Sequence, residues 1–163
     1  MNKLTPATIT ARIDGHGVRV QALDGATLHY LTGSEPALAP NTMIGEDPSF
    51  LWLAPDRVLR VAFAPAPSPT ARFTSDITGG LAIFAVSGAN AKALLAIGCS
   101  LDLPVALAPG RCAQSVFAGV RATLYAAPRG DGYRLHVDRA LAAYMLEWFA
   151  RAVASFGPED QQR

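Results

Sequence analysis

The chain has 163 residues, of which 50% are hydrophobic and only 17% are charged, and its formal net charge is +1. This length predicts one domain, residues 1–163, that buries a core without disulfides or metal ions. The balanced charge argues against nucleic acid or an anionic membrane as a partner, because both need clustered lysine and arginine. Since about 25% charged residues is usual in soluble domains, we expect part of this surface to be covered by a partner.

Targeting and metal-binding signals are missing from the sequence. Residues 1–6 lack an apolar signal core, and no apolar run approaches a membrane span of about 20 residues, so we expect a cytoplasmic protein without membrane contact. Cys99 and Cys112 share no close spacing with each other or with the three histidines, which does not fit a metal site. We expect both thiols to be reduced and packed.

The first half of the chain begins with strand and turn signals. Residues 8–13 and 18–22 alternate polar and apolar side chains around the turn residues 14–17, which predicts a hairpin. No helix start follows the glycines of this turn, so a turn is favoured over a phosphate loop. We expect a short helical turn within residues 24–33 and a loop over 34–47.

A second hairpin is predicted for residues 50–62. Its strands are joined at Pro55 and Asp56, because proline fixes φ at the second turn position and aspartate tolerates the third. Trp52, in the first strand, is a candidate core or interface anchor. The alternating prolines of residues 64–70 exclude a helix and predict an extended connector.

The segment on which the rest of the fold depends is residues 81–86. These residues are apolar on both alternating faces, which predicts a central strand covered on both sides. Gly88 follows the strand, a segment with high helix propensity comes next, and Gly98 is placed to close that helix in the left-handed conformation. Asp102 follows at the exit, before a predicted loop over 103–110.

Three more strands are predicted in the last third of the chain. Residues 111–117 and 120–126 flank a two-residue turn, and residues 133–138 alternate apolar and polar side chains. His136 falls on the polar side of this alternation. Without an acid or a nucleophile nearby, we expect a solvated histidine rather than a catalytic one.

The chain closes with a helix that Asp138 can cap. Its apolar residues, Trp148 among them, recur at helical spacing and are expected to be core; a partner surface is the alternative, because the stripe is wide. Glu147 and Arg151 are expected to form an i,i+4 pair on the outward face. Residues 157–158, Gly-Pro, should end the helix.

Six segments in register resemble the gamma subunit of heterotetrameric sarcosine oxidase. They are residues 40–42 (PNT), 51–59 (LWLAPDRVL), 75–77 (SDI), 86–91 (VSGANA), 98–103 (GCSLDL) and 109–113 (PGRCA). That family is similar in fold to the folate-binding domain of glycine-cleavage aminomethyltransferase. The resemblance therefore implies an α+β fold, a mostly antiparallel sheet with helices packed on it, in a duplicated strand-helix-hairpin-helix plan.

The resemblance also implies a function and a set of partners. The chain would be an accessory subunit of a complex that oxidatively demethylates sarcosine or a related N-methyl amino acid. The alpha and beta subunits of that complex would carry FAD, FMN and NAD, and its small delta subunit would carry zinc. The gamma subunit would hold none of these cofactors, although tetrahydrofolate is possible in the complex.

The sequence departs from the family pattern in its first half. The proline connector replaces the helix between the tryptophan-containing hairpin and the Ser-Asp strand, and the helix near residues 24–40 is short. The first half is thus a trimmed copy of the plan that the second half keeps whole. We expect one sheet face there to be under-covered, with an exposed apolar patch around residues 62–73 that serves as a contact surface.

Two classes of function compete. A non-catalytic subunit packed on a flavoenzyme fits the low charge and the lack of catalytic, cofactor-binding or metal residues, and it is favoured. A stand-alone folate-dependent enzyme or carrier would need a carboxylate in the hairpin after the central helix, where residues 116–121 have none. A free-standing folate-sensing domain is a third possibility.

The residues singled out for the site are structural or interface candidates. Three of them, Asp76, Asp102 and Arg111, lie at the edge of the central unit, where capping or a local ion pair is favoured over substrate binding. The full set is Trp52, Asp56, Asp76, Gly88, Asp102, Arg111 and Trp148.

Overall fold

The computed structural model describes residues 11–34, 37–130 and 132–156. Its fold is α+β, and every strand pairing among these residues is antiparallel, which agrees with the α+β fold and mostly antiparallel sheet that the family resemblance implies. The elements in chain order are β1 (Arg12–Gly15), β2 (Val18–Leu23), β3 (Thr27–Ser34), β4 (Met43–Ile44), β5 (Ser49–Ala54), β6 (Arg57–Ala62), β7 (Ala71–Asp76), β8 (Leu81–Ser87), α1 (Ala91–Gly98), α2 (Leu103–Ala106), β9 (Cys112–Phe117), β10 (Val120–Ala126), β11 (Tyr133–Asp138), the 3₁₀ turn η1 (Arg139–Leu141) and α3 (Ala142–Ser155).

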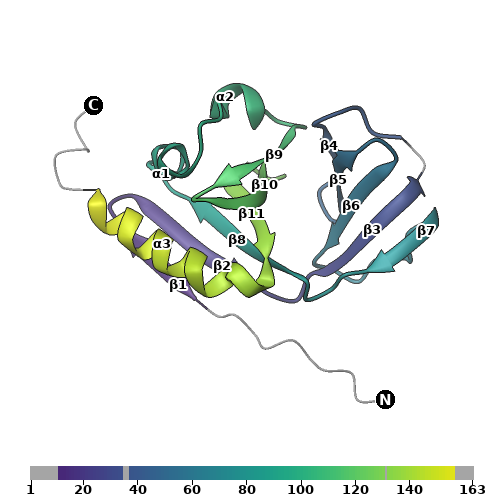
Figure 1. Ribbon diagram of the computed structural model, residues 1–163, viewed down its shortest axis with the longest axis horizontal. Helices are drawn as coiled ribbons and strands as arrows, with labels where there is room; N and C mark the ends of the chain where they lie inside the picture. Colours follow the sequence, from purple (N-terminus) through teal and green to yellow (C-terminus); the bar gives the residue numbers. More distant parts are fainter. Residues whose placement is uncertain (1–10, 35–36, 131, 157–163) are drawn as a thin grey trace, which may run out of the picture.

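The strands form two sheets. The larger sheet has six strands in the order β1-β2-β8-β11-β10-β9, and helices α1 and α3 lie on one of its faces (Figure 1). The smaller sheet has five strands in the order β4-β5-β6-β3-β7 and faces the other side of β8 to β11. β8 therefore lies between two strands and between two layers, which confirms the predicted central strand.

Both sheets repeat one strand order. In the larger sheet β8 is followed by β11, β10 and β9, with β2 on its other side; in the smaller sheet β3 is followed by β6, β5 and β4, with β7 on its other side. The repeat in the larger sheet contains α1 and α2, and at the matching place the described part of the repeat in the smaller sheet has a loop at residues 37–42. The repeat in the larger sheet ends in α3, and at that place the repeat in the smaller sheet has the connector 63–70. The first half thus keeps the strands of the plan and lacks its helices.

The larger sheet combines strands from distant parts of the sequence. β2 precedes β3 in the chain but pairs with β8 of the larger sheet. The smaller sheet is built from the contiguous strands β3 to β7, and β7 pairs with β3 although it directly precedes β8 in the chain. The larger sheet therefore cannot be completed by the second half of the chain alone, because it needs β1 and β2.

Two apolar clusters hold the layers together. The helix-side core packs α1 and α3 on the larger sheet, and the inter-sheet core fills the space between the sheets. Apolar side chains of β8 alternate between them, with Phe84 on the helix side and Ile83 between the sheets. The buried residues of the inter-sheet core are Leu28, Met43, Leu51, Leu59, Val61, Ile83, Cys112 and Tyr125.

Most predicted elements are confirmed, and the first-half helical turn is wrong. Residues 24–33 contain most of β3, because pairing with both β6 and β7 buries its leucines and overrides the local turn signals. The loops predicted at 34–47 and 103–110 contain β4 and the one-turn helix α2. The expectations for residues 8–10 and 157–158 lie outside the described residues.

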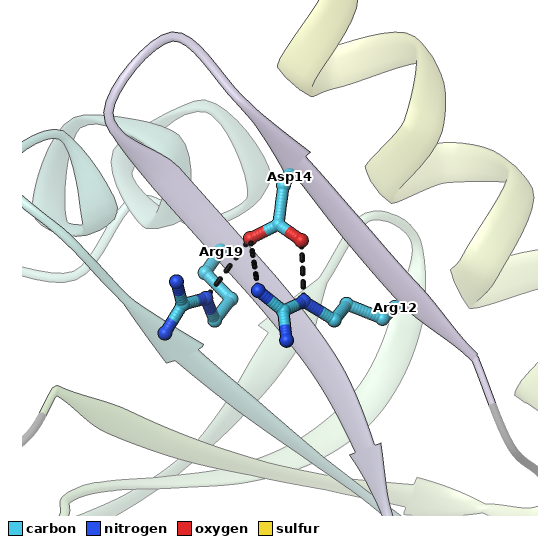
Figure 2. Close-up of polar contacts among 3 residues, drawn as sticks. All are labelled: Arg12, Asp14 and Arg19. Atoms are coloured by element: carbon cyan, nitrogen blue, oxygen red, sulfur yellow. Dashed lines mark hydrogen bonds and ion pairs between the residues drawn. The ribbon is translucent and has the colours of Figure 1, made fainter.

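The hairpin β1–β2 carries a three-residue charged cluster on the surface (Figure 2). Asp14 accepts hydrogen bonds from Arg12, its neighbour on β1, and from Nε of Arg19 at 2.9 Å, directly opposite on β2. The hydrogen bonds from both guanidinium groups hold the pKa of Asp14 below its usual value. Because the cluster is exposed, it contributes little to the stability of the fold.

Gly98 ends α1 for a reason that differs from the predicted one. It is absent from the glycines with positive φ, and the residue after it, Cys99, is extended. A Cβ at Gly98 would instead lie less than 3.0 Å from the ring of Phe117, a distance that real Cβ atoms essentially never show. Glycine is required here because α1 packs directly against this ring.

Gly98→Ala should therefore destabilise the protein by about 1–3 kcal/mol, although glycine to alanine in a helix ordinarily stabilises by about 1 kcal/mol. A double-mutant cycle with Phe117→Leu, measured by urea unfolding, tests the cause. The cost of Gly98→Ala should shrink when leucine replaces the ring. An equal cost in both backgrounds would show that the ring is not responsible.

Candidate functional site

The seven predicted candidates are spread over the fold and do not converge on one site. Trp52 and Asp56 belong to the β5–β6 hairpin, Asp76 ends β7, Gly88 follows β8 and Asp102 precedes α2. Arg111 precedes β9, and Trp148 lies on α3. In the part of the chain that the structure describes, no group of three or more histidine, cysteine or acidic side chains could hold a metal ion.

Two of the family-like segments meet where the edge strands of the two sheets touch. Residues 41–43 exchange backbone hydrogen bonds with residues 110–112, and Thr42 and Arg111 form an isolated antiparallel bridge. Trp52 joins them, since its N–H donates to the Thr42 carbonyl at 3.0 Å. These segments therefore fasten the sheets to each other.

The Cys112 thiol lies inside this junction. Its Sγ is 3.2 Å from the Thr42 carbonyl oxygen and 3.5 Å from that of Trp52. Burial raises the pKa of this thiol to about 11, although the hydrogen bond to the Trp52 carbonyl and the charge of Arg111 oppose the shift. Both cysteines are free, and Cys112 is a packed thiol rather than a reactive one, as expected from the sequence.

The acidic candidates make local hydrogen bonds. Asp56 has a positive φ of 62° in the β5–β6 turn, and its carboxylate accepts from the N–H of Gly33 at 2.8 Å. Asp76 accepts from the N–H of Thr78 at 2.8 Å. Asp102 occupies the cap position of α2 but makes no side-chain capping bond. These contacts favour turn formation over substrate binding.

Trp148 belongs to an aromatic cluster on the inner side of α3. Its ring lies 4.9 Å from that of Phe117 and 5.4 Å from that of Phe149, both edge-on. The two phenylalanines are fully buried, whereas Trp148 is half-buried. The apolar stripe on α3 is therefore mainly core, and Tyr144 is its large exposed member. The Glu147–Arg151 pair predicted on the outward face is present.

A buried polar pair between the sheets was not predicted. His136 was expected to be solvated, but the smaller sheet covers its face of β11, and only 2% of the residue is exposed. Its Nε2 lies 3.0 Å from the Tyr125 hydroxyl, and its Nδ1 has no hydrogen-bond partner. Burial, assisted by Arg134, lowers the pKa of His136 to about 3, so the ring is neutral. Strand alternation alone could not reveal a second layer.

Among the described residues no helix packs on the outer face of the smaller sheet, but this face is not open as the sequence led us to expect. Leu31, Val58 and Arg60 on it are only 1%, 5% and 3% exposed, because the connector 63–70 lies over it. Exposed apolar side chains flank it within the predicted patch: Phe63 is 42% exposed, and Phe73, on the edge strand β7, is 62% exposed. An edge strand presents unpaired backbone groups as well, so this end of the molecule has the features of a contact surface.

Sequence comparison identifies the family. The model of the sarcosine oxidase, gamma subunit family matches residues 71–155, from β7 through α3, which is just over half of the chain. The chain belongs to the sarcosine oxidase gamma subunit family. This confirms the resemblance carried by the six segments.

Structure comparison agrees with this assignment at the level of the fold. The gamma-family chain resembles a chain of the heterotetrameric sarcosine oxidase from Corynebacterium sp. U-96, solved in complex with pyrrole 2-carboxylate, with a TM-score of 0.73. The two are 16% identical, and the similarity covers 89% of this chain and 88% of the other. No curated protein sequence matches the chain.

The helices of this chain were compared with the requirements of a membrane span. None of the helices in the described ranges combines the length and the apolar character that a bilayer span needs.

Proposed function

We propose that this chain is a non-catalytic accessory subunit of a heterotetrameric complex that oxidatively demethylates sarcosine or a related N-methyl amino acid. The complex would be cytoplasmic, and residues 1–163 would form one domain of it. The observation that carries the proposal is the gamma-family match over 71–155. It is supported by the scatter of the polar candidates, which serve turns and junctions instead of meeting at a reaction centre.

The partners follow from the family. They would be alpha, beta and delta subunits, with FAD, FMN, NAD and zinc held by those chains and tetrahydrofolate possible in the complex. The relation to the folate-binding domain of aminomethyltransferase belongs to the same proposal. The strand order repeated in both sheets supports it, because that fold is expected to be duplicated.

The contact surface would be the open end of the smaller sheet. Strand β7 is exposed along almost its whole length, and Phe73 projects from it. An aromatic side chain on an unpaired edge gives a partner both apolar area and backbone hydrogen bonds. We therefore expect the flavoprotein partner to cover this edge.

Recovery of partner chains from the native cell tests this function. The tagged chain should co-purify with a large flavin-containing protein, identified by flavin absorbance and by the masses of the chains. Phe73→Ser should reduce that recovery several-fold, because it removes exposed apolar area from the proposed contact.

Ile97→Ser is the matched control, because Ile97 is similarly exposed but lies on α1, and recovery should be unchanged. A lone chain at native expression levels would overturn the proposal. Tetrahydrofolate binding by the isolated chain at micromolar concentration would favour the folate-carrier alternative instead.

A further inference from the structure

A buried arginine lies on the outer face of the smaller sheet. Arg60, on β6, is only 3% exposed, because the connector 63–70 lies over it. The strand registers place it in one cross-strand row with Ile44 and Phe50 on one side and His29 and Asp76 on the other. Its side chain therefore lies against apolar neighbours on the side toward β4.

The guanidinium group has fewer partners than donors. Its Nη2 donates to the Pro67 carbonyl at 3.0 Å, and its Nη1 is 3.4 Å from Nδ1 of His29. A guanidinium carries five N–H donors. Among the described residues no carboxylate lies within ion-pair distance of it: Asp76 shares the row, but His29 stands between them.

A cavity of about 300 Å³ opens next to this charge. Among the described residues that line it, only Arg60, Ser68 and Thr70 are polar, and none is acidic. The main apolar lining residues are Leu31, Ile44, Phe50, Val58, Pro67 and Pro69.

A buried charge without a counter-charge is costly, and natural proteins normally pair it. Here the sheet and the connector bury the cation, and the open space beside it is where a counter-ion would fit. We propose that this cavity binds a small organic acid with one carboxylate, which pairs with Arg60 while its apolar body fills the cavity.

Charge and wall chemistry define the ligand class. One guanidinium balances one negative charge, and its planar donors match the two oxygens of a carboxylate. Apolar walls stabilise a hydrocarbon or aromatic body but offer little to a strongly hydrated ion such as phosphate. An aromatic monocarboxylate should therefore bind, and inorganic phosphate should not displace it.

Calorimetric titration of the full chain with phenylacetate tests the proposal. Phenylacetamide, which has the same aromatic body but no charge, is the matched control ligand. Phenylacetate should bind with a dissociation constant of about 1 mM or below, and the amide at least about tenfold more weakly. Arg60→Gln should weaken phenylacetate binding about tenfold or more. Arg57→Gln, an exposed position on the same strand, should leave it unchanged.

A second variant covers the case in which Arg60→Gln fails to fold. Ile44→Trp keeps the charge but fills the mouth of the cavity from a side chain that is 42% exposed, and it should also weaken binding. The proposal would be overturned if phenylacetate and phenylacetamide bound equally well, or if phosphate displaced phenylacetate. It would also be overturned if neither cavity variant weakened binding, or if phenylacetate showed no saturable binding up to about 10 mM.

Discussion

Gly88→Ala should destabilise the fold by about 3 kcal/mol or more, a large part of the stability of a domain of this size. Gly88 has a φ of 106°, which side-chain-bearing residues rarely adopt. A Cβ there would also lie less than 3.0 Å from the carbonyl oxygen of Gly17, a backbone atom that cannot turn aside. That oxygen accepts the N–H of Asn90 at 3.1 Å, so moving it would also disturb the start of α1.

Gly25→Ala separates the two causes. Gly25 has a φ of 81°, and a Cβ there would meet nothing within 4 Å, so this variant carries conformational strain alone, about 1 kcal/mol. Urea unfolding at neutral pH should rank the proteins as wild type, then Gly25→Ala, then Gly88→Ala. If the two variants were equally stable, the close approach of the β1–β2 turn to residue 88 would have no energetic weight.

Stability should also fall steeply with acid because of His136. The pKa of this histidine is lowered to about 3 by burial in the folded chain, whereas in the unfolded chain it should be near its ordinary value of about 6.5. Between these values the unfolded chain binds a proton that the folded chain does not. The free energy of unfolding should therefore drop by about 1.4 kcal/mol per pH unit below 6.5, or about 2–3 kcal/mol by pH 4.5.

Carboxylates also titrate in this pH range, but they do so equally in wild type and in His136→Gln. The difference between the two proteins therefore gives the part of the pH dependence that is due to His136. His136→Gln should be less stable at neutral pH, because it disturbs the contact with Tyr125, but its stability should change less between pH 7 and 4.5. His16→Asn, at an exposed turn position, should keep the wild-type slope. Parallel curves for His136→Gln and wild type would contradict a neutral, buried His136.

The outer face of the smaller sheet shows how far the pattern of the first half could be followed. The prolines of residues 64–70 exclude a covering helix, but the connector that they form lies over the face itself, so the large exposed apolar side chains of this region are at its margin, Phe63 and Phe73. Arg60 was not found in this way. In the run Arg57–Ala62 it looks like an ordinary polar position, and only the connector folded across the sheet makes it a buried cation.

The sequence by itself determined the hairpins, the central strand, the final helix and the family, because these depend on alternation, turn residues and short motifs that act over a few neighbouring positions. Tertiary structure alone decided that residues 27–34 form a strand, that Gly98 faces Phe117 and that His136 is buried. Each of these depends on a second layer or a partner strand from a distant part of the chain. The pairings of β2 with β8 and of β3 with β7 supply such long-range contacts, and no local pattern encodes them.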